Sequence, residues 1–84
     1  MTSGTITQIN PRSGMFAVRL DEEGSFAVFS CYHGIDIAVG DRVQGNLGVV
    51  GLEPLLHLVH GQVFDAFGES GECTLQQATR FINP

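Results

Sequence analysis

The histidines and cysteines are the residues of this chain that could bind a metal ion. His57 and His60 are three residues apart, a spacing that would place both rings on one face of a helix as two zinc ligands. Cys31 and His33 could complete a set of four ligands. Structural zinc sites, however, use closely spaced Cys-x2–4-Cys or His-x3–5-His pairs, and the chain has neither. We therefore predict no metal site and no cofactor.

Nucleophilic chemistry is suggested by Cys31-Tyr32-His33, where a thiol and an imidazole stand two residues apart. On an extended chain such residues share a face but do not point at each other. The sequence also offers no group that would orient the imidazole or stabilise an oxyanion. We predict no catalytic residues and expect that the protein is not an enzyme.

Two further patterns have simple structural interpretations. The acidic run 21–23 could bind a cation, but it is more typical of the solvated tip of a hairpin. The glycines of the segment 45–51 recur at every third position, yet they lack the lysine and the strand-to-helix context of a phosphate-binding loop.

Composition limits the classes of partner. The 84 residues include four arginines, no lysine and nine acidic residues, giving a net charge of −5. No cation occurs between positions 43 and 79. Binding to a phosphate backbone relies on cations that displace counterions, so this balance disfavours nucleic acid without excluding a local basic patch.

Length and hydropathy favour a single domain, residues 1–84. No run of 18 apolar residues is present, so we expect no membrane span, and the N-terminus lacks the pattern of a secretory signal. We therefore expect a cytoplasmic protein in which Cys31 and Cys73 are reduced thiols.

The first half predicts a three-stranded meander. Strands are expected at 4–9, Met15–Leu20 and Ser25–Ser30, separated by a Pro- and Gly-containing turn at 10–14 and by a tight hairpin at 21–24. In the second strand, Phe16, Val18 and Leu20 should point inward. In the third, we expect Phe26 and Val28 to point inward and Ala27 and Phe29 outward.

The second half predicts alternating elements: a fourth strand at Arg42–Leu47, a short helix at 53–61, a fifth strand at Gln62–Phe67, an acidic loop at 68–72 and a final helix at Leu75–Ile82. Thr74 is the expected N-cap of the final helix, with Gln77 at the capping-box distance. The apolar stripe of this helix is expected to cover an open end of the barrel, and it is formed by Leu75, Ala78 and Ile82, with Phe81 alongside.

A family frame is visible between Gly4 and Val43. Gly4, Ile6, Asn10 and Gly14 fit this frame without gaps, and Gly40-Asp41 stands at its entry to strand four. In this frame the stretch resembles the cold-shock domain family, whose OB-fold barrels bind single-stranded RNA and DNA. The resemblance covers about half of the chain, and the part from Gly48 onward resembles nothing in that family. The resemblance implies an OB-fold-like (cold-shock-like) barrel. Together with the elements predicted in the second half, it gives a mainly all-β fold, a small five-stranded barrel with a short helix before the last strand and a C-terminal helix.

The family's base-binding side chains are mostly replaced in this chain. Stacking of a base on an aromatic ring contributes roughly 1–3 kcal/mol, and members of the family carry several such rings on strands one to three. Of these positions only one, Phe29, is aromatic here. The others are Gln8, Ile9, Met15, Ala17, Ala27 and Ser30, while Thr7 and Ser13 stand in place of lysines.

This substitution predicts a small non-catalytic interaction module that binds a protein, or itself as a homodimer, through the outer face of strands one to three. The predicted face consists of Gln8, Met15, Ala17, Arg19, Ala27 and Phe29. The face could be left exposed for association, or it could be covered by one of the two helices and become core. The alternative function is single-stranded nucleic-acid binding, with contacts from Arg12, Arg19, Phe29 and Arg42.

Overall fold

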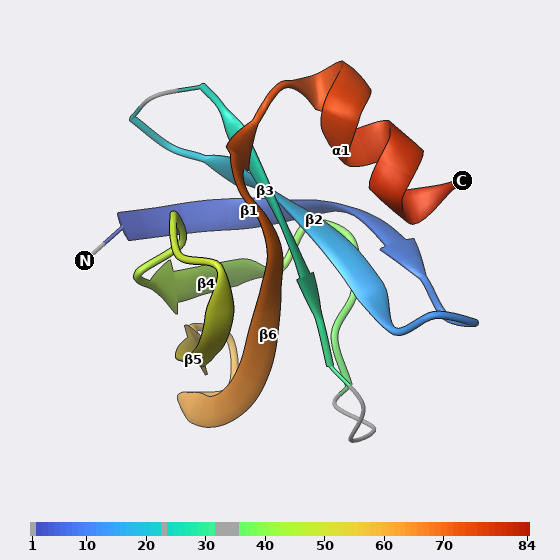
Figure 1. Ribbon diagram of the computed structural model, residues 1–84. Coiled ribbons are helices and arrows are strands. Elements are labelled where there is room, and N and C mark those ends of the chain that lie inside the picture. The colour runs from blue at the N-terminus through green and yellow to red at the C-terminus, as the bar shows by residue number, and fades with distance from the viewer. Residues whose placement is uncertain (1, 23, 32–35) are drawn as a thin grey trace.

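The computed structural model describes residues 2–22, 24–31 and 36–84, so Tyr32 and His33 of the candidate thiol–imidazole pair lie outside the described residues. The described residues form a closed barrel and one helix (Figure 1). The elements are β1 (Thr2–Asn10), β2 (Met15–Leu20), β3 (Phe26–Ser30), β4 (Arg42–Gly45), β5 (Gly51–His57), β6 (Gln62–Cys73) and α1 (Leu75–Ile82).

The barrel consists of two three-stranded meanders. β1, β2 and β3 form the first meander and β4, β5 and β6 the second, and the ring closes by pairing β1 with β4 and β3 with β6. All pairs are antiparallel. A ring can be antiparallel at every step only if its number of strands is even. The predicted small, mainly β barrel is confirmed, but it has six strands and not five.

The additional strand is β5, which replaces the short helix predicted at 53–61. Its side chains alternate with the period of a strand: Leu55 and His57 are buried, whereas Leu52 and Pro54 are exposed. The helix prediction was wrong because the outer side of this segment is apolar and its inner side carries the polar Glu53 and His57, so the sequence lacks the apolar-inside, polar-outside alternation of a typical strand. Pro54 is tolerated because the β4–β5 ladder includes only the last two residues of β5, leaving Pro54 beyond it.

The predicted acidic loop at 68–72 is also strand, because β6 continues to Cys73. β6 pairs first with β5 and then with β3, and it curves strongly between the two partners (Figure 1). At the bend, a Cβ on Gly68 would lie 2.2 Å from the carbonyl oxygen of Val49, so only glycine fits. A bulge follows, where Gly71 has φ +65° and the Val28 amide donates to Ser70 Oγ at 2.9 Å.

In the first meander the strand and turn predictions are largely confirmed. The predicted second strand matches β2, and the turn after β1 closes with the Gly14 amide donating to the Asn10 carbonyl at 3.0 Å. Gly14 and Gly24 have positive φ angles of 74° and 64°, as their turns require.

The predicted orientation of the third strand was wrong. Ala27 and Phe29 face the barrel interior, and Phe26 and Val28 face outward. The register explains this, because Phe29 is the direct partner of Phe16, and direct partners share a face. The two rings stack with centroids 6.0 Å apart. Every residue from Phe26 to Phe29 is apolar, so polarity could not indicate which set points inward.

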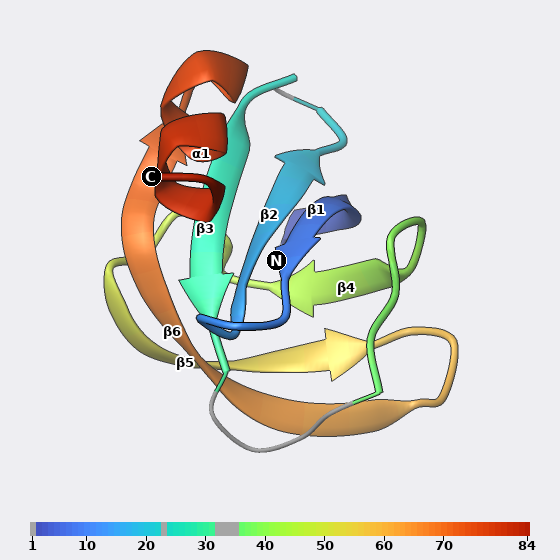
Figure 2. The ribbon, with the colours of Figure 1, turned by 90° about the vertical axis from the view of Figure 1, so that its right-hand side faces the viewer.

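The helix α1 begins as predicted. Thr74 Oγ1 accepts from the Gln77 amide at 3.1 Å, and Gln77 Oε1 accepts from the Thr74 amide at 3.0 Å, which completes a capping box. However, α1 does not close an end of the barrel. Ala78 and Ile82 pack on Ala17 and Val28, so the helix lies on the outer side of β2 and β3 (Figure 2).

Two side chains of β1 form hydrogen bonds with the helix. Asn10 Nδ2 donates to the Ile82 carbonyl at 2.7 Å, and Gln8 Nε2 donates to Thr79 Oγ1 at 3.1 Å. Within the described part of the chain, no helix has the length and apolar character needed to cross a membrane.

Candidate binding surfaces

The predicted binding face is divided between the two sides of the sheet. Gln8, Met15 and Ala17 lie together against α1, and Ala17 is fully buried by it. Arg19 follows on the same side of β2 and is exposed. The C-terminal helix therefore covers three of the six residues of the predicted face, and cover by a helix was one of the two interpretations that the sequence allowed.

Ala27 and Phe29 lie on the opposite side, inside the barrel. Phe29 is 0% exposed and stacks on Phe16. A ring in this position cannot stack on a base while the barrel is folded. Phe29 was predicted as the remaining base-stacking residue on the expectation that it points outward from the third strand. Because it points inward, it is not available for stacking.

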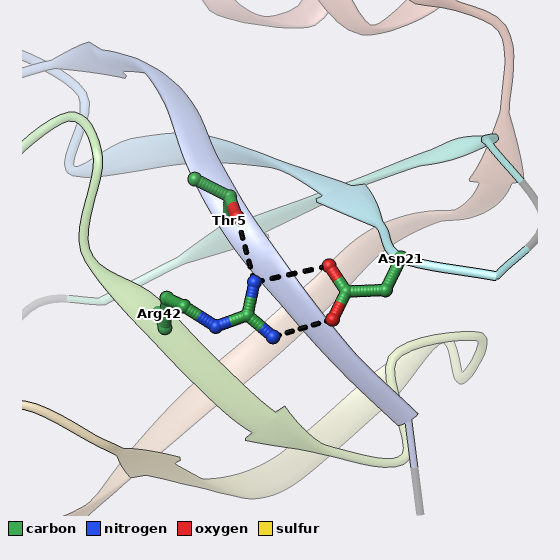
Figure 3. Close-up of polar contacts among 3 residues, drawn as sticks. All are labelled: Thr5, Asp21 and Arg42. Atoms are coloured by element: carbon green, nitrogen blue, oxygen red, sulfur yellow. Dashed lines mark hydrogen bonds and ion pairs between the residues drawn. The ribbon is translucent and has the colours of Figure 1, made fainter.

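Arg42, a candidate nucleic-acid contact, is held by Asp21 and Thr5 (Figure 3). One guanidinium nitrogen donates to Thr5 Oγ1 and to Asp21 Oδ1, each at 3.1 Å, and the other donates to the second carboxylate oxygen of Asp21. The hydrogen bond from Arg42 lowers the pKa of Asp21, and the carboxylate in turn raises the pKa of Arg42. A phosphate would have to compete with this two-pronged pair.

The three candidate arginines are not gathered into one patch. Thr5 is the cross-strand partner of both Arg19 and Arg42, so these two lie near each other. Arg12 lies in the turn beyond the other end of β1, more than roughly 15 Å farther along the strand direction.

The two histidines of the possible metal pair do lie close together, but on a strand end and the turn after it. The rings of His57 and His60 have centroids 4.8 Å apart, and buried His57 places Nε2 2.8 Å from Asp41 Oδ2. The hydrogen bond with His57, then that from the Ala38 amide, lowers the pKa of Asp41. The cluster thus ties the segment before β4 to β5. Among residues 2–22, 24–31 and 36–84, no group of three or more His, Cys, Asp or Glu side chains is arranged to hold a metal ion.

A surface that the sequence analysis missed lies on the outer side of the second meander. Three cross-strand pairs of β5 and β6 project outward there. We call this surface the β5–β6 face, and its pairs are Leu52 with Phe67, Pro54 with Asp65, and Leu56 with Val63. The exposed fractions of Leu52, Val63 and Phe67 are 72%, 63% and 43%. In the sequence, Val63 to Phe67 is apolar except at Asp65, so polarity did not indicate which side chains point outward, and the helix predicted at 53–61 left this strand without its neighbour β5.

The surface covered by α1 and the exposed β5–β6 face lie at the two ends of one row of cross-strand partners. Met15 of β2 pairs with Ser30 of β3, Ser30 with Phe67 of β6, and Phe67 with Leu52 of β5. Ser30 is buried within this row, and its hydroxyl donates to Glu69 Oε2 at 2.6 Å. The outward-facing apolar side chains therefore form two separate surfaces, the one beneath α1 and the β5–β6 face, and the Ser30–Glu69 hydrogen bond lies between them.

Comparison with family models, with curated proteins and with solved structures finds no match for this chain. The resemblance to the cold-shock family therefore depends on residues 4–43 alone. The second meander, which carries the β5–β6 face, lies almost wholly outside that stretch.

Proposed function

We propose that the protein is a non-catalytic interaction module that binds a protein surface through the β5–β6 face. The partner is either another protein or a second copy of this chain. The observation that carries this proposal is the exposure of Leu52, Val63 and Phe67 on one side of two neighbouring strands, where Leu52 pairs directly with Phe67 and Val63 pairs with Leu56. Isolated apolar residues are common on protein surfaces, but contiguous ones indicate a contact site.

The chemistry of the face resembles the centre of a protein interface. Leucine, valine, proline and phenylalanine side chains surround one charged group, Asp65, which pairs across the strands with Pro54. Full burial of one such large apolar side chain contributes about 1.5–3 kcal/mol. Asp65 would favour a partner that presents a cation opposite it, because an unpaired carboxylate at an interface centre is costly.

The location of the proposed site differs from the sequence-based expectation. Strands one to three were expected to supply the contact surface, but α1 packs on the outer side of β2 and β3. The helix already provides the burial that a partner would have provided there. The function proposed from the sequence is therefore retained, and its site moves to the second meander.

Single-stranded nucleic acid is the less favoured partner. Phe29 is buried and Arg42 is engaged by Asp21, so two of the four expected contacts are occupied within the fold. Phe67 is exposed, but the cross-strand pairs that surround it on the β5–β6 face include no lysine or arginine. An apolar face without cations supports protein binding.

The resemblance of residues 4–43 leads us to propose that the barrel is OB-like. Support comes from the opening meander with its Gly14 turn and from the closure of the ring. The second meander, with its sixth strand, is the departure from the five-stranded pattern.

Photo-crosslinking in cells tests the proposed function. A photoreactive phenylalanine analogue at Leu52 should give a discrete covalent adduct, and the adduct's mass distinguishes a second copy from another protein. The same analogue at Gln76, an exposed position on α1, should give none. Adding Phe67→Ser to the Leu52 probe should abolish the adduct. Absence of any discrete adduct from probes at both Leu52 and Val63 would overturn the proposal.

A further inference from the structure

A second site lies on the opposite meander, in a groove beside α1. The groove has a volume of about 420 Å³ and is lined by Met15, Gln77, Arg80, Phe81 and Pro84. This volume falls within the range of small-molecule sites. Gln77, Arg80 and Phe81 are spaced i, i+3 and i+4 on α1, so they form one stripe next to the buried stripe of Ala78 and Ile82, and Pro84 follows the end of the helix.

The walls of the groove are apolar. The thioether of Met15, the ring of Phe81 and the ring of Pro84 offer contact surface without hydrogen-bonding groups. Met15 is half-buried and Phe81 is 39% exposed, so both can contact a ligand without leaving the fold. This lining suits an aliphatic or aromatic group.

The polar groups at the groove are donors. Gln77 Oε1 already accepts from the Thr74 amide, which leaves the amide NH2 group of Gln77 for a ligand. Arg80 forms no ion pair with any residue in the described ranges, whereas Arg42 is paired with Asp21. Two sets of donors beside an apolar groove complement one anionic group, and guanidinium binds a carboxylate through two parallel hydrogen bonds.

We propose that this groove binds a small amphipathic carboxylate, such as a medium-chain fatty acid. The aliphatic chain lies against Met15, Phe81 and Pro84, and the carboxylate accepts hydrogen bonds from Arg80 and Gln77. None of the lining side chains is acidic, so an amine finds no side-chain partner for its charge, and an alcohol leaves the positive charge of Arg80 unpaired. A polyphosphate carries several negative charges, but Arg80 is the one cationic side chain in the lining, and the chain as a whole has a net charge of −5 that would repel a polyanion.

Titration of the 15N-labelled protein with decanoate, below its micelle concentration, tests this assignment. Saturable amide shifts are expected at Met15 and at residues 77–83, with little change on the β5–β6 face. Decanol should bind about tenfold more weakly or worse, since it lacks the charge-assisted hydrogen bonds, and decylamine should not bind in the groove. Shifts confined to the β5–β6 face would overturn the carboxylate site while leaving the proposed function intact.

Arginine variants separate the site from the net charge. Arg80→Gln should weaken decanoate binding roughly tenfold or more, because it removes the charged donor. Arg12→Gln makes the same charge change in the turn after β1 and should leave the affinity unchanged. Arg80→Lys keeps the charge, should retain part of the affinity, and gives a second measurement if Arg80→Gln disturbs the fold. Equal weakening by Arg80→Gln and Arg12→Gln, or no saturable shift with the wild type, would contradict the proposal.

Discussion

The outer surfaces of the two meanders are both apolar, but only one of them is covered by the chain itself. On the first meander, Ala17 and Val28 are fully buried by Ala78 and Ile82 of α1. On the second, the larger side chains of the β5–β6 face have no such cover, and Leu52 is 72% exposed. Small alanines on strand and helix allow the close approach that a short helix needs. The outer face that α1 covers is part of the core, whereas the outer face that no element covers among the described residues remains exposed for contact with a partner.

The strongest test of this comparison is a matched pair of phenylalanine truncations. Phe29→Ala should reduce the free energy of unfolding by about 3–5 kcal/mol, because it opens a cavity beside Phe16. Phe67→Ala should cost about 1 kcal/mol or less, since it loses mainly the cross-strand contact with Leu52. Urea unfolding followed by circular dichroism measures both. Similar losses in the two variants would mean that the inside and the outside of the barrel have been assigned incorrectly.

Loosening the helix should sharpen the contrast between the covered and the bare face. Thr74→Ala removes the N-cap hydrogen bond and should destabilise the protein by about 1 kcal/mol. Amide hydrogen exchange should accelerate first in α1. Gln76→Ala, at an exposed position of the same helix, is the control and should stay within about 0.5 kcal/mol of wild type. If hydrogen exchange in α1 is unchanged by Thr74→Ala, the capping box does not stabilise the packing of α1 on the first meander.

The smallest effect is expected from the ion pair that joins β4 to the turn after β2. Because the pKa of Asp21 is lowered in the folded protein, the pair stabilises the fold above the ordinary aspartate pKa of about 4. That contribution is lost as the pH falls below this value and through the lowered pKa. Arg42→Gln should therefore flatten the loss of thermal stability between pH 5 and pH 2.

Arg12→Gln is the matched control for this prediction. Arg12 lies in an exposed turn and forms no ion pair within the described ranges, so its variant should follow the wild-type acid profile. A profile of Arg42→Gln that is as steep as that of wild type would show that the pair contributes nothing to acid stability.

Local interactions explain what the sequence could predict. The Gly14 and Gly24 turns depend on positive φ angles within a few residues, and the start of α1 depends on Thr74 and Gln77 alone. These features need no information from distant parts of the chain. β2 was also predicted correctly because its exposed Arg19 marks the outward face.

Non-local pairing explains what the sequence could not predict. β5 carries its polar residues Glu53 and His57 on the inner side and apolar residues on the outer side, the reverse of the usual pattern. The orientation of β3 is set by the pairing of Phe29 with Phe16. The docking place of α1 depends on hydrogen bonds between residues 72 positions apart in one case, Asn10 and Ile82. The sequence predicted that Gln8, Met15 and Ala17 share one side of the sheet, and the structure places them together there, against α1. The β5–β6 face could not be predicted because it depends on a strand, β5, where the sequence predicts a helix.

The closure of the ring has a consequence for how any partner is recognised. Each of the six strands has a paired neighbour on both sides over at least part of its length, so the backbone left for an added strand is limited to segments such as residues 51–55 of β5, which lie beyond the β4–β5 ladder. Backbone pairing, which accepts almost any sequence, has little unpaired strand to use. Recognition then depends mainly on the shapes and charges of side chains, and single substitutions on either partner should be enough to weaken it.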